Sequence, residues 1–189
     1  MTCFDSFPKD IATVQIGCRT YVFFVNKDNR LCYIDKDDRE GLGDFVAHPI
    51  EIDSGMKIKS DSRQVAAVAW VPKDAAGNFK RGHWEIRVYC ICNEDGQSYL
   101  QEVCLSSKDK ENWYQGWMGS DRQKDEDDQR RYVDNGSSLS ALGCGYENIR
   151  VFVSGRCENG RPKIEVHSYN VAKDGNWDVE TIPEPIFSV

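Results

Sequence analysis

A pattern of short apolar segments recurs three times along this chain of 189 residues. The clearest copy contains VAAVAW at Val65–Trp70, IRVY at Ile86–Tyr89, LQE at Leu100–Glu102 and WYQG at Trp113–Gly116. Self-similarity at a spacing of tens of residues is typical of repeated supersecondary units, because one unit cannot bury its apolar face alone. The repeat therefore restricts the chain to several copies of one small unit that pack on each other.

Two weaker copies flank this central copy and contain similar segments in the same order. Their segments are Ile11–Ile16, Tyr21–Phe24 and Leu31–Tyr33 before it, and Leu139–Cys144, Ile149–Phe152, Lys163–Val166 and Trp177 after it. The segments are short, alternate apolar with polar residues and are rich in Val, Ile, Tyr, Phe and Trp, which is typical of β-strands. Polar and glycine residues such as Asp95-Gly96 separate them and favour tight hairpins.

Each copy offers about four strands, which matches the four-stranded antiparallel blade of a β-propeller. We therefore predict an all-β propeller fold in one domain over 1–189, with blades at about 11–52, 65–118 and 139–182. A dense run of mixed charge at 121–134 lies between the second and third blades, and we expect it to form a solvated loop.

Composition excludes several classes of partner. The net charge of -7 argues against nucleic acid, because phosphate binding needs a cationic surface. The N-terminal sequence MTCFDSFPKD lacks the features of a secretory signal, and no segment approaches the roughly 20 apolar residues of a membrane span. We therefore expect a cytoplasmic protein with no nucleic-acid or membrane partner. The eight cysteines are spaced irregularly, so we interpret them as reduced and mostly buried, and we expect no metal and no cofactor.

The ordered set VAAVAW, IRVY, DGQSYLQE and WYQGW resembles the blade repeat of the fungal fucose-specific lectins. The resemblance is close over the central copy, fair over the third and weak over the first. Members of that family are six-bladed propellers that bind the sugar between adjacent blades. An arginine on the second strand and a glutamate on the third bind the sugar hydroxyls, and an aromatic residue of the next blade stacks on the sugar.

The resemblance implies that Arg87 and Glu102 hold the sugar, with Tyr169 and its neighbour His167 supplied by the third blade. A guanidinium and a carboxylate can form charge-assisted hydrogen bonds with vicinal hydroxyls, and an aromatic ring can cover the apolar face of a sugar. The alternative for Arg87 and Glu102 is a simple cross-strand ion pair on a sheet surface.

The other two copies depart from the family pattern. The third copy keeps Arg150 but has Val166 at the glutamate position, whereas the first copy has Tyr21 and Tyr33 at the two positions. The sequence therefore predicts at most one complete sugar site per chain.

Three blades do not close a propeller, and natural proteins pair or cover open sheets. Small bacterial relatives of the family assemble six blades from two-blade subunits. The resemblance therefore implies that this chain is half a propeller, completed to six blades in a homodimer.

An enzyme on a lectin-derived propeller is the second hypothesis, because one fold can host unrelated functions. Loss of two sugar sites fits a cavity for an apolar small molecule, such as the substrate of a cofactor-free, pericyclase-like cyclisation or isomerisation in fungal natural-product biosynthesis. Such a reaction needs a shaped cavity and one acid or base. The candidates are Glu102, Glu85, His83 and Tyr89. We rank a non-catalytic, fucose-binding lectin first.

Overall fold

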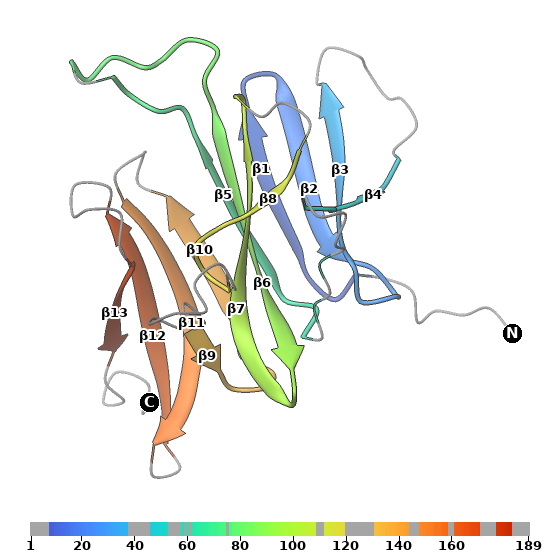
Figure 1. Ribbon diagram of the computed structural model, residues 1–189, viewed down its shortest axis with the longest axis vertical. Helices are drawn as coiled ribbons and strands as arrows, with labels where there is room; N and C mark the ends of the chain where they lie inside the picture. The colour runs from blue at the N-terminus through green and yellow to red at the C-terminus, as the bar shows by residue number, and fades with distance from the viewer. Residues whose placement is uncertain are drawn as a thin grey trace, which may run out of the picture.

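The computed structural model describes residues 8–37, 46–52, 58, 60, 62–74, 76–108, 112–119, 131–143, 148–158, 161–170 and 177–182. Within these ranges all regular structure is β-strand, and three antiparallel sheets stand side by side (Figure 1). The predicted all-β fold of three four-stranded units is therefore confirmed. The described ranges contain no helix that could cross a membrane.

The strands follow each other in the sheets in chain order. The first sheet contains β1 (Ile11–Ile16), β2 (Arg19–Val25), β3 (Leu31–Asp37) and β4 (His48–Pro49). The second contains β5 (Val65–Trp70), β6 (Glu85–Glu94), β7 (Gln97–Ser106) and β8 (Tyr114–Gln115). The third contains β10 (Leu139–Gly143), β11 (Asn148–Glu158), β12 (Arg161–Asn170) and β13 (Trp177–Ile182).

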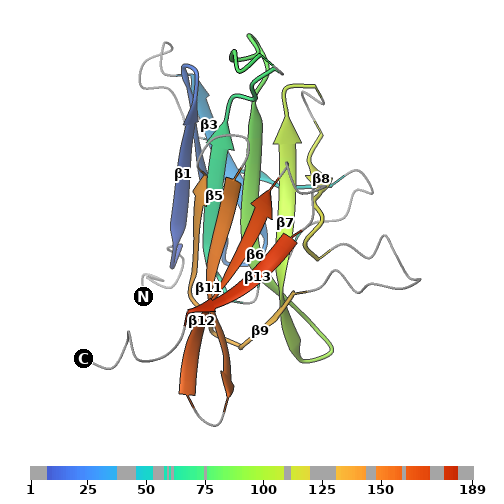
Figure 2. The same ribbon diagram turned by 90° about the vertical axis from the view of Figure 1, so that its left-hand side faces the viewer.

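One further strand, β9 (Arg131–Val133), joins the second sheet beside β7 (Figure 2). The charged segment at 121–134 was expected to form a loop. This expectation is wrong for the last part of the segment, where Arg131–Val133 form a strand. The physical reason is local, because Val133 is only 4% exposed and packs into the apolar core between the second and third sheets. Residues 120–130 lie outside the described ranges.

Two apolar cores hold the three sheets together. One lies between the first and second sheets and includes Phe23 and Val88, and the other lies between the second and third sheets and includes Tyr89 and Val151. Successive side chains of a strand point to opposite faces, so neighbouring residues of β6 enter different cores. The second sheet is thus buried on both faces.

The pairing register defines equivalent positions in the three sheets. The equivalent cross-strand pairs are Phe23–Tyr33, Tyr89–Glu102 and Phe152–Val166. Two positions before the first member of each pair stand Tyr21, Arg87 and Arg150. Among these equivalent positions, an arginine and a glutamate occur together only in the second sheet.

The packing leaves one open face at each end of the row of sheets (Figure 1). In β1 the side chains alternate, so that Ala12 and Val14 enter the first core while Ile11 is 59% exposed on the outer face. In β10, Leu139 and Ala141 enter the second core while Leu142 is 51% exposed. Each outer face therefore presents a large apolar side chain.

Candidate functional site

A pocket of about 250 Å³ lies between the second and third sheets, at the end of the molecule where β5 ends and β6 begins. Its apolar and aromatic lining consists of Trp70, Pro72 and Tyr169. Its polar lining consists of Lys80, His83, Glu85, Arg87 and Lys108. The pocket thus combines aromatic walls with several charged groups, as small-ligand sites do.

The connection between β5 and β6 forms one wall of this pocket. It is an ordered hairpin in which Lys73 and Phe79 form a β-bridge and the backbone N of Lys80 donates a hydrogen bond to the Pro72 carbonyl. At its tip, the Asp74 carboxylate accepts hydrogen bonds from two backbone N–H groups of the turn. These bonds fix the path of the chain and so hold the pocket side chains of this segment in place.

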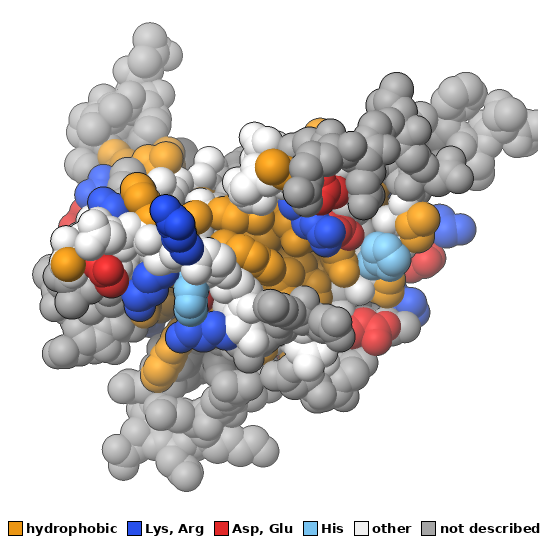
Figure 3. Space-filling model, turned by 90° about the horizontal axis from the view of Figure 1, so that it is seen from above, with side chains coloured by type: hydrophobic (Ala, Val, Ile, Leu, Met, Phe, Trp, Pro, Cys, Tyr) orange, Lys and Arg blue, Asp and Glu red, His pale blue; other side chains and the backbone are white. Residues whose placement is uncertain are grey.

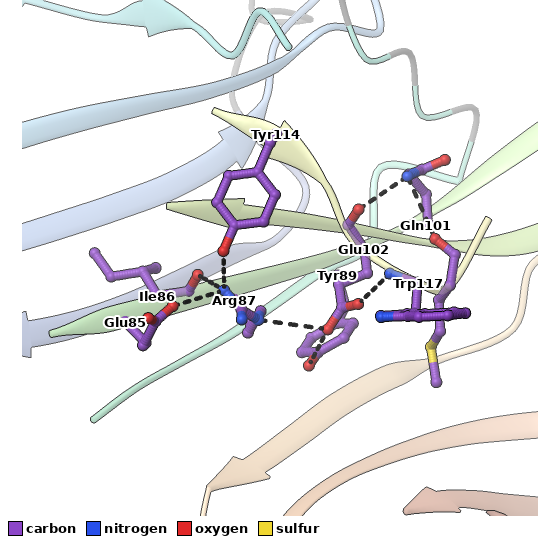
Figure 4. Close-up of polar contacts among 9 residues, drawn as sticks. Glu85, Ile86, Arg87, Tyr89, Gln101, Glu102, Tyr114 and Trp117 are labelled. Carbon is purple, nitrogen blue, oxygen red and sulfur yellow. Dashed lines mark hydrogen bonds and ion pairs between the residues drawn. The ribbon is translucent and has the colours of Figure 1, made fainter. Parts of the chain in front are cut away.

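Arg87 extends from β6 into the pocket between two aromatic rings. Its guanidinium carbon lies 5.4 Å from the ring centroid of Trp70 and 5.7 Å from that of Tyr114. Its Nη1 donates hydrogen bonds to Glu85 Oε2 at 3.1 Å and to the Tyr114 hydroxyl at 3.2 Å (Figure 4). The side chain is 20% exposed, so it is held on several sides and still reaches the pocket.

Glu102 lies behind Arg87, in the interior. Its Oε1 accepts a hydrogen bond from the Tyr89 hydroxyl at 3.1 Å and lies 3.8 Å from Arg87 Nε. Its Oε2 accepts one from the backbone N of Trp117 at 2.9 Å (Figure 4). Burial raises the pKa of Glu102, although Arg87, Tyr89 and the backbone donors oppose this shift. Glu102 is 4% exposed and is not part of the pocket lining. Its carboxylate therefore positions Arg87 from the side that faces away from the pocket.

The surroundings of Arg87 favour its charged form. Burial by itself lowers the pKa of the guanidinium. The neighbouring groups Cys104, Glu102, Tyr114 and Glu85 act in the opposite direction and raise the pKa above its ordinary value. Arg87 is therefore a permanent cation in the pocket wall.

Gly116 is a residue of this site whose role sequence reasoning missed. Its backbone N donates a hydrogen bond to the Glu102 carbonyl at 2.9 Å. A Cβ atom at this position would overlap Glu102 Oε2 and lie 2.5 Å from Glu102 Cγ. The glycine that ends the WYQG segment is thus required for the buried position of Glu102, and its place in the repeat was the available signal.

The third sheet supplies Tyr169, which lies on β12 and lines the same pocket as Arg87. Its ring centroid is 5.3 Å from that of Trp177, which in turn packs against Tyr89 at 6.2 Å. The structure therefore brings Arg87 and Tyr169 together across two sheets. It places Glu102 directly behind them.

His167 does not line the pocket. It lies on the same face of β12 as Tyr169, but it is 1% exposed and packed in the interior. Neither ring nitrogen has a hydrogen-bond partner in the part of the chain that the structure describes, and Nε2 lies 3.6 Å from Glu165 Oε2. Its place in the fold is that of a core residue below the pocket.

The residues considered for acid–base chemistry lie in two places. Glu85 and His83 line the pocket, whereas Tyr89 and Glu102 are buried and bonded to each other behind it. Burial raises the pKa of Tyr89 well above its ordinary value. The Glu85 carboxylate accepts a hydrogen bond from Arg87, so Arg87 restrains it.

No protein-family model and no curated protein sequence matches this chain. Among solved structures, the chain is similar to a fucose lectin from Kordia zhangzhouensis, determined in complex with methyl-fucoside. The two share 15% identity with a TM-score of 0.50, and the match covers 90% of this chain and 97% of the lectin chain. At this identity the likeness concerns the fold, which is therefore propeller-like. The lectin is bacterial, so membership of the fungal family stays a prediction.

The described ranges contain no group of three or more His, Cys, Asp or Glu side chains that could hold a metal ion. The cysteines described there form no disulfide, and Cys32, Cys90, Cys92 and Cys104 are buried. Cys90 and Cys92 lie on one face of β6 with their sulfur atoms 3.9 Å apart.

We expect His167 to make stability depend on pH. Burial lowers the pKa of His167 to about 4, and the charge of Arg131 contributes in the same direction. The unfolded chain, with an ordinary histidine pKa near 6.5, therefore takes up the proton first as pH falls. The free energy of unfolding should decrease by up to about 3 kcal/mol between pH 7 and pH 4 from this group alone.

Urea unfolding at both pH values measures this effect. His167→Phe should remove that part of the pH dependence, whereas the control His48→Gln, at an exposed position, should retain it. An unchanged pH dependence in His167→Phe would show that the histidine is not buried as a neutral group.

Proposed function

We propose that this protein is a non-catalytic carbohydrate-binding protein that holds fucose or a similar sugar between its second and third sheets. The observation that carries the proposal is the pocket in which the Arg87 guanidinium and the Tyr169 ring meet. The guanidinium supplies hydrogen bonds to hydroxyls, and the ring supplies a surface for the C–H face of a sugar. The fold similarity to a fucose lectin supports the choice of sugar.

The hydrogen bonds of Arg87 leave part of the guanidinium available to a ligand. Nη1 donates hydrogen bonds to Glu85, Tyr114 and the Ile86 carbonyl, and Nε is the guanidinium nitrogen that lies near Glu102. Nη2 has no hydrogen-bond partner among the described residues. A planar guanidinium fixed on one side loses little conformational freedom when the other side binds hydroxyls, and such preorganisation favours affinity.

The same contacts favour binding over catalysis. Glu102 and Tyr89 are buried behind Arg87, and Glu85 accepts a hydrogen bond from Arg87. The polar groups of these three side chains therefore bond to Arg87 or to each other, which favours a role in positioning Arg87 over a role in acid–base chemistry. No observation on the described residues favours cyclisation or isomerisation of an apolar substrate.

Calorimetric titration with methyl α-L-fucoside tests the proposal. Wild-type protein should bind, and Tyr169→Ala should weaken the affinity about tenfold, because an aromatic contact contributes up to about 1.5 kcal/mol. Trp117→Ala is the matched control, since this side chain is 53% exposed and does not line the pocket. Equal affinity of Tyr169→Ala and wild type would contradict the assignment of the pocket.

We also propose that two copies of the chain form a closed ring of six sheets. The support is the packing along the row, in which the second sheet packs one face on the first sheet and the other face on the third. This packing leaves the outer faces of the first and third sheets, with Ile11 and Leu142, as complementary surfaces. A second copy would cover both at once.

Analytical ultracentrifugation at micromolar concentration should show a dimer. Leu142→Lys should shift the wild-type dimer toward monomer, because a charge would replace the apolar contact. Phe79→Lys is the control, since Phe79 is 67% exposed on the β5–β6 hairpin, away from both outer faces. A wild-type monomer under these conditions would refute the ring.

A further inference from the structure

We propose that the pocket selects sugars that carry an anionic substituent, either a sulfate ester or a carboxylate. This inference rests on the proposed function and names the class of sugar more narrowly. It follows from the charges that line the pocket, from two lysines that form no close ion pair with a described residue, and from the exposed position of both lysines.

The pocket lining is cationic in an acidic protein. Arg87, Lys80 and Lys108 oppose a single carboxylate, Glu85, whereas the whole chain has a net charge of -7. Seen from above, Lys and Arg side chains and a histidine gather on the side of the molecule that carries the β5–β6 connection (Figure 3). Local charge of this kind attracts ligands of opposite sign even when the protein as a whole repels them.

The two lysines account for the excess charge. Arg87 is paired with Glu85 at 3.1 Å and lies 3.8 Å from Glu102, so nearby carboxylates balance its charge. Lys80 and Lys108 form no close ion pair with a described residue, although the charge of Lys80 helps to lower the pKa of Asp74, and both lysines are exposed. Arg87 and the aromatic ring are sufficient for the hydroxyls and C–H face of a neutral sugar. The two ammonium groups have no role in that recognition.

The position of the lysines separates two parts of the pocket. Trp70, Pro72 and Tyr169 provide the apolar walls, and the volume of about 250 Å³ is below the roughly 300 Å³ at which sites for drug-sized ligands begin. This space suits one sugar ring. Lys80 comes from the β5–β6 hairpin and Lys108 from the turn after β7, so two separate segments bring positive charge to one opening.

Backbone hydrogen bonds within the β5–β6 hairpin fix the position of Lys80. Its backbone N donates to the Pro72 carbonyl at 2.8 Å, and its own carbonyl accepts from the backbone N of His83 at 3.1 Å. The connection between β5 and β6 is extended relative to those between β1 and β2 and between β10 and β11, and it brings one of the two lysines to the pocket. We infer that this extension adapts a site for a neutral sugar to a charged one.

Calorimetric titration tests the inference with three ligands at low and moderate salt. The three ligands are methyl α-L-fucoside, its monosulfate ester and inorganic sulfate. A separate comparison of glucuronic acid with glucose tests a carboxylate as the substituent. At low salt the sulfated fucoside should bind about tenfold more tightly than the neutral one, and added salt should reduce this advantage. The double variant Lys80→Gln/Lys108→Gln should abolish the advantage, so that the sulfated and the neutral fucoside bind with equal affinity.

The matched control is Lys27→Gln/Lys73→Gln, which removes the same charge from exposed sites outside the pocket and should preserve the advantage. If glucuronic acid binds more tightly than glucose while the sulfated fucoside shows no such advantage, the substituent is a carboxylate. Equal affinity for neutral and sulfated fucoside, together with equal affinity for glucose and glucuronic acid, would overturn this inference and leave the proposed function intact. Inorganic sulfate bound as tightly as the sulfated fucoside would also overturn it, because the sugar would then contribute nothing. No binding of any sugar would refute the proposed function itself.

Discussion

Replacement of Arg87 by alanine is expected to abolish detectable sugar binding and to destabilise the fold. A hydrogen bond from a charged donor to a sugar hydroxyl is worth about 1.5–3 kcal/mol, so its loss weakens the affinity by about 10- to 150-fold. The substitution also leaves Glu102 buried without its nearest cation. Because Arg87 and Glu85 keep some exposure, we expect a decrease of about 2–3 kcal/mol in the free energy of unfolding.

Titration with methyl α-L-fucoside and urea unfolding measure the two effects separately. Arg19→Ala is the matched control, because Arg19 also pairs with a carboxylate, Asp35 at 2.8 Å, but its side chain is 49% exposed. This control should bind sugar normally and lose less than about 1 kcal/mol of stability. Wild-type affinity in a folded Arg87→Ala protein would exclude the guanidinium from the site.

The second large effect is expected for Gly116→Ala. The added methyl group would overlap the Glu102 carboxylate, which is itself held by Tyr89 and by the backbone N of Trp117. Overpacking of an interior costs about 1–3 kcal/mol, and displacement of the carboxylate breaks buried hydrogen bonds as well. We expect the free energy of unfolding to fall by about 3 kcal/mol and the affinity for sugar to weaken, since Arg87 loses its support.

Gly143→Ala provides the comparison for this substitution. Its added Cβ would lie 3.4 Å from the nearest atom, Val68 Cβ, which is ordinary van der Waals contact. This variant should change stability by less than about 0.5 kcal/mol. If Gly116→Ala is equally mild, Glu102 has room to move and does not hold Arg87 in a fixed place.

The repeat and its alternation predicted the arrangement of sheets. The segments that begin at Ile11, Val65 and Leu139 each start a four-stranded unit because each has alternating apolar residues followed by turn residues. The register then places Arg87 and Arg150 at equivalent positions, as the repeat alone indicated. Local pattern is sufficient for these features, because pairing within a unit involves strands that follow each other in the chain.

Features that depend on contacts between distant segments could not be predicted. Strand β9 forms because Val133 finds an apolar surface between two sheets, and no repeat marks it. His167 shares a strand face with Tyr169, so alternation could not show that one is buried and the other lines the pocket. Sequence reasoning also missed Trp70, Lys80 and Lys108 as pocket residues, and the long polar segment between Trp70 and Glu85 was the available signal.

A crystal structure of the protein with methyl α-L-fucoside at saturating concentration tests the central claim most directly. We predict one sugar ring per chain between the second and third sheets, stacked on Tyr169 with a hydroxyl within hydrogen-bond distance of Arg87 Nη2. An empty pocket in such a crystal, or a sugar bound at a different place on the fold, would contradict it.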